Sequence, residues 1–362
     1  MIYKNIRKER MIQMLSGRRS AITRRPVPMK IVPMNIVKTP PPTPPKQIEP
    51  VLFSEKNTKK YTVRLLYDVP GWAYYWQCEA MKKYAPDDFD VTIGGDYMPA
   101  LKQKKHDLVL QMCYSNAKEL RKSIDITYPK TVLVSIYSVG WNYNNDWLTG
   151  CINDSDYVIC NNYEMWDKYG KHPKTFTISN GVDFDKFYIQ KPIEKRKQKV
   201  LWIGSMIHRK VKNYDSIILP LKKMLDRDRI ESDFRLVDSC GKNRMDQKQM
   251  CDWYQTGTIY IVPSSSEGTP NPLIEASACG CIPVSTRVGN AIEMIENGVN
   301  GYLCDTNALS LYKGIKSTIP NYLTMSKNMQ ETIKEWGWKE RSEQYFDLFR
   351  KLIDERRSNV QS

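Results

Sequence analysis

The sequence predicts an α/β protein in which two doubly wound domains follow a basic, proline-rich N-terminal extension. Two observations predict the α/β class. Short apolar runs alternate with helical patterns from Tyr61 onward, and strand, loop and helix signals follow one another closely near residues 258–285. The length sets the number of domains, because 362 residues with 41% hydrophobic content can supply two cores of ordinary size.

The first fifty residues form the extension, which we expect to be flexible. They contain eleven Lys or Arg and two Glu, so +9 of the formal net charge of +15 lies here. Residues 38–46 are typical of a polyproline II spacer, and the composition does not favour a core. The charge suits a polyanion such as DNA, RNA, an acidic glycan or an anionic membrane. A solvated tail without a fixed partner is the alternative.

Residues 51–190 are expected to form the first doubly wound domain. Apolar runs predict its strands, and a helical pattern continues from Trp72 to about Tyr84. Such domains bind ligands at the carboxyl ends of their parallel strands, so the loops there are candidate binding loops. The predicted strands are residues 63–67, 91–93, 107–112, 131–136 and 157–160, and the loops are residues 68–72, 94–97, 113–116 and 138–143.

The clearest unit of the second domain runs from a strand at residues 258–262 to another at 282–285. Asn271 between them is a good N-cap, and Pro272 suits the first position of a helix. Gly280 stands where a C-cap belongs. This order of strand, loop, helix and strand predicts a parallel sheet.

Two carboxylates, Glu267 and Glu275, lie around the start of that helix. The free N–H groups of a helix start attract phosphate, and a carboxylate accepts hydrogen bonds from adjacent hydroxyls. The pattern therefore favours a nucleotide sugar, with one carboxylate on the hexose and the other, in the first helical turn, on the ribose. Gly268 would let the backbone approach the sugar. In the alternative interpretation, Glu275 complements the helix dipole and Glu267 is a solvated loop charge.

Further motifs accompany the two glutamates in a fixed order. They are Asn180-Gly-Val-Asp183, Val200-Leu-Trp-Ile-Gly204, Val262-Pro-Ser264, Ala278-Cys-Gly280, Pro283-Val284, Gly289, Glu293 and Asn300-Gly301. Read together, the region from about Asn180 to Tyr345 resembles the donor domain of family-four retaining glycosyltransferases of the GT-B fold, the glycogen synthase-like or group 1 enzymes. The resemblance implies two Rossmann-like domains facing across a cleft. Residues 191–335 would bind the donor, and residues 336–362 would form a C-terminal helix that could cross back to the first domain.

The resemblance also implies a donor site. The family usually has Arg directly after the glycine of the first loop and Lys five residues later, both for the diphosphate, whereas here Ser205 follows Gly204. Arg209, Lys210 and Lys212 are the candidates to replace these cations, and which of them contacts the diphosphate stays open. With Glu267 they are the predicted catalytic residues. The predicted donor-binding residues are Gly204, Ser205, Glu267, Gly268, Thr269, Pro270, Asn271 and Glu275.

The first domain is expected to select the acceptor, with Gly71, Trp72 and Ser138 as candidate contacts. Members of the family often carry a histidine in this domain near the transferred sugar. No good equivalent is found, because His106 precedes a strand and His172 lies in a polar loop.

The function that the resemblance implies is retaining, metal-independent transfer of a hexose from a nucleoside-diphosphate sugar to a hydroxyl of a glycan, a lipid-linked molecule or a protein. A hydroxymethylated base of DNA is the alternative acceptor. Other classes that remain open are a sugar-nucleotide epimerase, a glycan phosphorylase and a catalytically silent GT-B scaffold. Nothing in the sequence fixes the base or the sugar of the donor, with a UDP-sugar slightly favoured.

The cysteine pattern and the hydropathy indicate the expected metal content and cellular location. Nine cysteines without a Cys-x-x-Cys pair, beside three histidines, do not favour a zinc site or a disulfide framework. We expect no metal and no cofactor besides the donor substrate. No apolar run has the length of a membrane span, and the N-terminus lacks a signal-peptide core. A cytoplasmic protein is expected, and residues 1–50 would allow it to be peripheral to a membrane or nucleic acid.

Overall fold

The computed structural model describes residues 61–95, 105–112, 117–127, 130–138, 145–168, 172–238 and 245–359. All of them belong to one unit, which comprises Pro45–Ser362. The basic extension lies outside the described residues. So do residues 96–97, 113–116 and 139–143 of the predicted binding loops.

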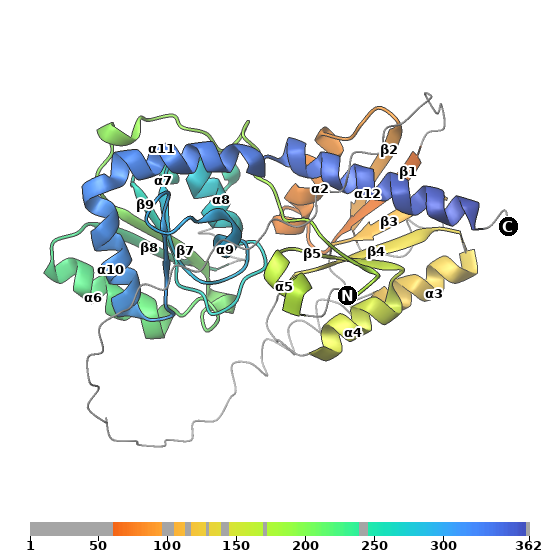
Figure 1. Ribbon diagram of the computed structural model, residues 1–362, viewed down its shortest axis with the longest axis horizontal. Helices are drawn as coiled ribbons and strands as arrows, with labels where there is room; N and C mark the ends of the chain where they lie inside the picture. Colours follow the sequence, from red (N-terminus) through yellow and green to blue (C-terminus); the bar gives the residue numbers. More distant parts are fainter. Residues whose placement is uncertain are drawn as a thin grey trace, which may run out of the picture. The chain divides into compact units, whose positions relative to one another are not determined.

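The first half of the described chain forms a six-stranded parallel sheet with the order β2-β1-β3-β4-β5-β6 (Figure 1). Every residue of β3 and β4 is buried, as expected for central strands covered on both faces. The strands are β1 (Tyr61–Tyr67), β2 (Phe89–Gly95), β3 (Leu108–Gln111), β4 (Val132–Tyr137), β5 (Tyr157–Cys160) and β6 (Thr175–Thr177). The helices are α2 (Ala73–Lys83), α3 (Ala117–Thr127), α4 (Asn145–Asp154) and α5 (Tyr163–Lys168).

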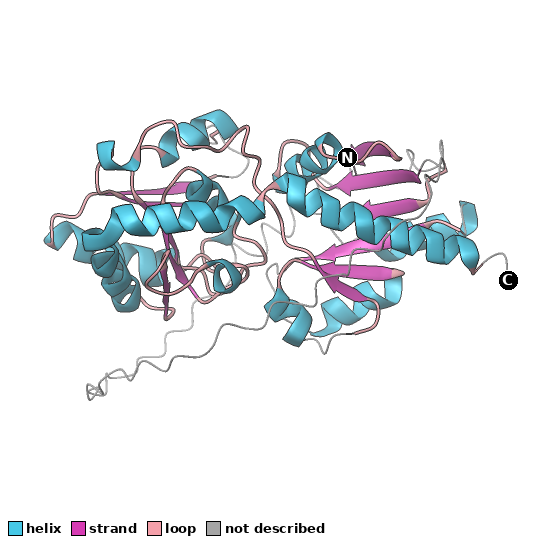
Figure 2. Ribbon diagram, turned by 45° about the horizontal axis from the view of Figure 1, so that its top comes forward, coloured by secondary structure: helices cyan, strands magenta, loops and turns pink. Residues whose placement is uncertain are grey.

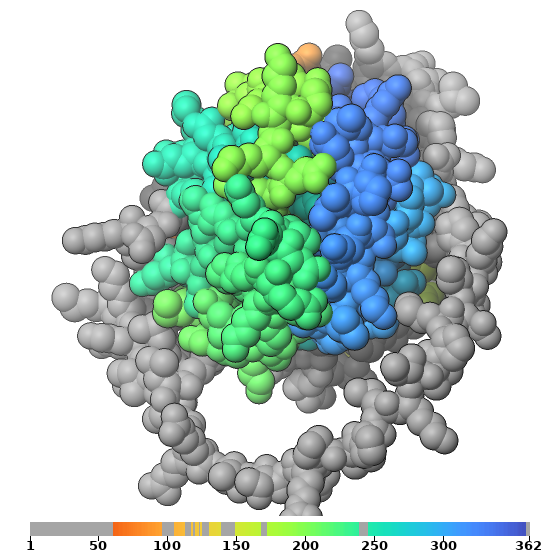
Figure 3. All heavy atoms as spheres, turned by 90° about the vertical axis from the view of Figure 1, so that its left-hand side faces the viewer, coloured from red at the N-terminus to blue at the C-terminus, as the bar shows by residue number. Residues whose placement is uncertain are grey.

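The second half forms a five-stranded parallel sheet with the order β11-β10-β9-β7-β8, so the predicted pair of parallel α/β sheets is confirmed. Helices α6 and α10 lie side by side on the face shown in Figure 3. The strands are β7 (Val200–Ser205), β8 (Ser232–Val237), β9 (Ile259–Val262), β10 (Ile282–Thr286) and β11 (Tyr302–Cys304). The α-helices are α6 (Leu219–Arg227), α7 (Gln247–Tyr254), α8 (Asn271–Ala278), α9 (Ala291–Met294), α10 (Ala308–Thr318) and α11 (Tyr322–Ile333). Shorter helical turns are η3 (Ile193–Lys195), η4 (Met206–His208), η5 (Tyr214–Ile218), η6 (Ile319–Asn321) and η7 (Lys334–Trp336).

The last helix, α12 (Trp338–Ser358), packs on the first sheet although it follows the second in the chain (Figure 2). The ring of Phe346 lies 4.7 Å from that of Phe89, and both belong to the core of the first sheet. At the surface, Arg350 donates to both carboxylate oxygens of Asp88 at 2.7 and 2.8 Å. No helix among the described residues, α12 included, is long and apolar enough to cross a membrane.

The chain passes between the two sheets twice, near Val182 and near Gly337, and hydrogen bonds join these two segments to each other. Val182 N–H donates to the carbonyl of Trp336 at 2.8 Å, and Trp338 N–H donates to the carbonyl of Val182 at 3.0 Å. A Cβ at Gly181 would lie 2.8 Å from the backbone of Trp338, so this crossing requires glycine. The Asn180-Gly-Val-Asp183 motif therefore marks the place where the chain passes between the two sheets.

Candidate functional site

A cavity of about 760 Å³ is lined by residues from the starts of α2 and α8. Gly71 and Ala73 line it at the start of α2, and Asn271 and Pro272 line it at the start of α8. The N–H groups of a first helical turn have no partner one turn earlier, which suits a helix start to an anion. In the first turn of α8, however, Pro272 carries no N–H and Leu273 N–H donates to the carbonyl of Pro270 at 2.7 Å, so the backbone donor offered there is Asn271 N–H. The other lining residues are Trp76, Gln77, Ala80, Gly181, Val182, Asp183, Lys186, Phe187, Met245, Asp246, Gln247, Lys248, Met250, Glu275 and Trp338.

Glu275 lies in the second turn of α8, not the first, because the helix starts at Asn271. The buried hydroxyl of Tyr254 donates to its Oε2 at 2.9 Å. Burial raises the pKa of Glu275 to about 7, while the hydrogen bond from Tyr254 acts in the opposite direction. The carboxylate is therefore held in place by α7 while it faces the cavity, and it retains capacity for further hydrogen bonds.

The loop before α8 is clamped through the carbonyl of Gly268. That oxygen accepts from Asn162 Nδ2 at 3.1 Å and from Asn290 N–H at 3.2 Å. Gly289, with φ of 49°, packs so closely that an added Cβ would lie 2.0 Å from the same oxygen. Gly268 is therefore buried, and its carbonyl is fixed by backbone packing.

Asparagines hold the rest of this loop. The hydroxyl of Thr269 donates to Asn290 Oδ1 at 2.5 Å, and Asn290 Nδ2 donates to the carbonyl of Asn161 at 3.0 Å. Asn180 Nδ2 donates to Asn271 Oδ1 at 3.0 Å. Because most of these groups are buried, they fix one conformation of residues 268–271.

Glu267 is held by groups from two directions. Its Oε1 accepts from Ser264 Oγ at 2.6 Å and from Lys212 Nζ at 2.5 Å. Two contacts bring the lysine there: Ser265 N–H donates to the carbonyl of Val211 at 2.9 Å, and Asn213 Nδ2 donates to the carbonyl of Pro263 at 2.9 Å. Of the three predicted cations, Lys212 is thus the one that the structure brings together with Glu267.

The other two predicted cations lie elsewhere on the same loop. Arg209 is exposed, donates through Nε to Asp215 at 2.7 Å and lies over the ring of Tyr214 at 5.0 Å. Lys210 is exposed. A Cβ at Gly204 would lie 2.4 Å from the indole of Trp202, so core packing favours glycine at this position. Ser205 ends β7 and is half-buried.

His208 belongs to the same corner, although the sequence did not single it out as a site residue. Burial and the charge of Lys212 lower its pKa to about 4, against the opposing effect of Glu267. The imidazole is therefore neutral near neutral pH. The sequence signal that could have pointed to His208 is its position three residues after the end of β7. His106 instead is buried against Thr92 Oγ1 at 3.1 Å, and His172 closes a turn by accepting from Lys174 N–H.

The predicted acceptor-side residues are only partly brought to the cavity. Gly71 lines it in a left-handed conformation with φ of 72°, and Trp72 is the N-cap of α2. Ser138, which follows β4, is half-buried and does not line the cavity.

Comparison with known proteins finds a family similarity in the second half of the chain. Residues 241–336 match the family model described as "Glycosyl transferases group 1". D-inositol 3-phosphate glycosyltransferase 2 of Catenulispora acidiphila is 28% identical over 118 residues, which are 32% of this chain and 28% of that protein. The chain thus spans little more than a quarter of that relative's length.

Solved structures resemble a larger part of the chain. Sucrose-phosphate synthase from Thermosynechococcus elongatus has a TM-score of 0.62 and 14% identity, covering 82% of this chain and 100% of that one. The complex of Anabaena HepE with UDP-glucose has a TM-score of 0.60 and 14% identity, covering 80% and 99%. At this identity the likeness shows the fold, while the family match rests on the sequence around α8. Residues 241–336 are thus similar to the group 1 glycosyltransferases, and the described chain has the fold of the solved structures that it matches.

Proposed function

We propose that the protein transfers a hexose, with retention of the anomeric configuration, from a nucleoside-diphosphate sugar to a hydroxyl acceptor. The observation that carries the proposal is the pairing of a half-buried Glu275 with the start of α8 in one cavity. A carboxylate suits the ribose diol, and the helix start suits the diphosphate. The binding of UDP-glucose by Anabaena HepE, which shares the fold, supports this class of donor.

Glu267 and Lys212 carry the other half of the proposed donor site. As the bond between the anomeric carbon and phosphate breaks, negative charge builds on the departing diphosphate. Lys212 would stabilise that charge together with Asn271 N–H at the α8 start. Glu267 would hold hydroxyls of the hexose, and the neutral His208 beside it could donate or accept one further hydrogen bond.

The acceptor hydroxyl would enter from the face that the diphosphate leaves. In this mechanism its proton passes to the departing phosphate, so no protein nucleophile is required. The hydroxyl would belong to a glycan, a lipid-linked molecule or a protein, and the first sheet, whose loop at Gly71 reaches the cavity, would select it.

A binding experiment with matched variants tests the proposal. Isothermal titration of the wild-type protein with UDP, GDP and ADP should reveal one preferred nucleotide, and Glu275→Gln should weaken its binding about tenfold. Glu343→Gln, an exposed position on α12, is the matched control and should bind normally. Equal binding by wild type and Glu275→Gln would exclude Glu275 as the ribose ligand.

A turnover experiment separates transfer from the other reactions of this fold. The protein is incubated with a nucleotide sugar labelled in the hexose, with and without a mixture of hydroxyl acceptors. Label on an acceptor, with the anomeric configuration of the donor, supports the proposal. Label that stays on the nucleotide as a new epimer, or moves to free phosphate, would overturn it.

A further inference from the structure

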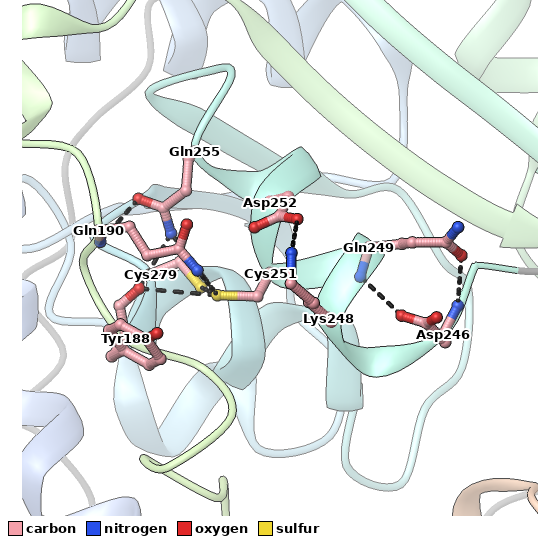
Figure 4. Close-up of polar contacts among 9 residues, drawn as sticks. All are labelled: Tyr188, Gln190, Asp246, Lys248, Gln249, Cys251, Asp252, Gln255 and Cys279. Atoms are coloured by element: carbon pink, nitrogen blue, oxygen red, sulfur yellow. Dashed lines mark hydrogen bonds and ion pairs between the residues drawn. The ribbon is translucent and has the colours of Figure 1, made fainter.

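Two thiols face each other beneath the wall of the donor cavity. Cys251 lies on α7 and Cys279 directly follows α8, and their sulfur atoms are 3.7 Å apart (Figure 4). Both side chains are buried. Helices α7 and α8 each supply residues that line the cavity, so a change in the spacing of these two sulfurs would reach the proposed donor site.

Amide groups surround the sulfur of Cys251. Gln190 Nε2 lies 3.4 Å from it and Gln255 Nε2 lies 3.9 Å from it, and both are hydrogen-bond donors (Figure 4). Donors aimed at sulfur favour the thiolate, which is the reactive form of cysteine. The hydrogen bond from the Cys279 thiol, and then contacts with the backbone of Tyr188 and the side chain of Gln255, hold the pKa of Cys251 below its ordinary value against the effect of burial.

A buried guanidinium next to these thiols lacks a carboxylate. Arg196 is 6% exposed, donates through Nη2 to Gln255 Oε1 at 2.6 Å, and leaves Nη1 without a hydrogen-bond partner. No carboxylate among the described residues forms an ion pair with it. Burying a cation is costly unless an opposite charge is near. The pKa of Cys279 is raised by its contact with Cys251 and by burial, and burial raises that of Cys281, so of the three nearby thiols Cys251 is the one favoured as the thiolate. Electrostatic attraction links Arg196 to Cys281, Cys279 and Cys251.

Two exposed residues contact the sulfur of Cys251. Its Sγ lies 3.8 Å from the backbone carbonyl of Tyr188 and 3.4 Å from the side-chain amide of Gln190, and both of these residues are exposed. A small oxidant therefore needs only local side-chain movement to reach Cys251. Cys281, by contrast, is occupied with the carbonyls of Tyr254 and Gly257 at 3.3 and 3.9 Å.

We propose that Cys251 and Cys279 form a peroxide-sensitive pair whose disulfide weakens binding of the donor nucleotide. The Cys251 thiolate attacks one oxygen of hydrogen peroxide, breaks the O–O bond and becomes a sulfenic acid while hydroxide leaves and is protonated. The Cys279 sulfur then attacks the sulfenic sulfur, and the oxygen leaves as water. In total two thiols and one peroxide give one disulfide and two waters.

The effect on the nucleotide follows from the geometry and rests on the proposed function. A disulfide requires a sulfur separation of about 2.05 Å, so α7 and the end of α8 must approach each other. Tyr254, three residues after Cys251, holds Glu275 through its hydroxyl, and Cys279 N–H donates to the carbonyl of Glu275 at 3.0 Å. Drawing these helices together would displace the carboxylate from its position in the cavity.

The test uses the full-length protein and hydrogen peroxide. After a short peroxide treatment, free thiols are blocked and the protein is digested without reduction, and mass spectrometry should find the peptide containing Cys251 joined to that containing Cys279. UDP affinity, measured by titration on the same sample, should fall about fivefold or more and return after dithiothreitol. Cys279→Ser should lose both effects, whereas Cys304→Ser, another buried cysteine, should keep both.

The cross-link and the UDP affinity test different parts of the proposal. The cross-link is detected whether or not the protein binds a nucleotide, so failure of the proposed function leaves this readout intact. Absence of the cross-link in folded wild type, or a cross-link from Cys251 to Cys281 instead, would overturn the assigned pair. A Cys251–Cys279 cross-link in a protein that binds UDP with unchanged affinity would overturn its effect on the donor site.

Discussion

The ammonium group of Lys212 lies 2.5 Å from Oε1 of Glu267, although 55 residues separate them in the chain. Both side chains are mostly buried, with exposed fractions of 21% and 12%. In the proposed reaction Lys212 serves the diphosphate and Glu267 serves the hexose. The donor must therefore compete with this ion pair, and its diphosphate would draw Lys212 away and release the carboxylate for the sugar hydroxyls.

The first prediction concerns which cation binds the diphosphate. Lys212→Ala should weaken UDP binding by about 2 kcal/mol, roughly thirtyfold, because it removes a charge-assisted contact. Arg209→Ala is the matched control on the same loop and should change affinity little, since Arg209 is exposed and paired with Asp215. Titration calorimetry of both variants measures this. A larger loss in Arg209→Ala would assign the diphosphate to the arginine instead.

The second prediction separates binding from turnover at Glu267. Glu267→Gln keeps the shape of the side chain but removes the charge that holds Lys212. UDP should therefore bind as tightly as in the wild type or more tightly, while kcat for transfer falls about a hundredfold because the hexose loses its carboxylate. Steady-state kinetics and UDP titration on one preparation give both values. A parallel fall in UDP affinity would show that Glu267 contributes to nucleotide binding directly.

The sequence predicted the strands on either side of α8, and the helix itself, because the signals for these elements are local. The prolines, Asn271 and Gly280 act within a few residues, and Gly280 is indeed left-handed after the helix. The predicted N-cap was wrong by one residue, because Pro270 is the N-cap and Asn271 is the first residue of the helix. The sequence did not reveal β8 (Ser232–Val237), whose six residues are all half-buried and include Asp233 and Arg235. It also missed β11, which has only three residues. A short or edge strand buries too little to impose a clear hydrophobic period.

The site was less predictable than the fold because it depends on contacts between distant loops. The sequence proposed Lys212 only as one of three cations, and its contact with Glu267 depends on how the loops after β7 and β9 pack together. The clamp between Asn162 and the carbonyl of Gly268 joins residues 106 positions apart. No local pattern encodes such a separation, so Asn162 and Asn290 were not foreseen as residues that position the site.

The third prediction is a pH dependence of donor binding. Ribose hydroxyls donate to the ionised form of Glu275, whose pKa burial raises to about 7 in the free protein. The affinity for UDP-glucose, whose diphosphate does not titrate in this range, should therefore increase between pH 6 and pH 8, with release of a proton on binding at the lower pH. The pKa of His208 is about 4, so this histidine does not contribute in that range. Calorimetry in buffers of different ionisation enthalpy measures the proton, and Glu275→Gln should abolish its release.

The same carboxyl predicts a pH dependence of folding with the opposite sign. A folded-state pKa above the ordinary value of 4.5 means that the folded protein binds more protons than the unfolded chain between pH 4.5 and 7. The contribution of Glu275 to the free energy of unfolding should accordingly decrease as pH rises through this interval. Denaturant titrations at a series of pH values give the free energy of unfolding of wild type and Glu275→Gln. Plotted against pH, the two free energies should change with different slopes between pH 4.5 and 7 and run parallel above pH 8. Parallel behaviour throughout would mean that Glu275 is not buried enough to shift its pKa.

The last prediction tests whether kcat depends on the position of the clamped loop that carries Glu267. Gly289→Ala adds a Cβ 2.0 Å from the carbonyl of Gly268, so the loop that carries Glu267 must move. Gly298→Ala is the matched control, because Gly298 also has positive φ, 82°, but open space around it. The control should cost about 1 kcal/mol of stability through strain alone and keep normal kcat. Gly289→Ala should cost about 3 kcal/mol and lower kcat at temperatures where it is still folded, because its Glu267 no longer meets the hexose. Equal kcat in the two variants would mean that this loop tolerates displacement, and that the position of Glu267 is set by Ser264 and Lys212 alone.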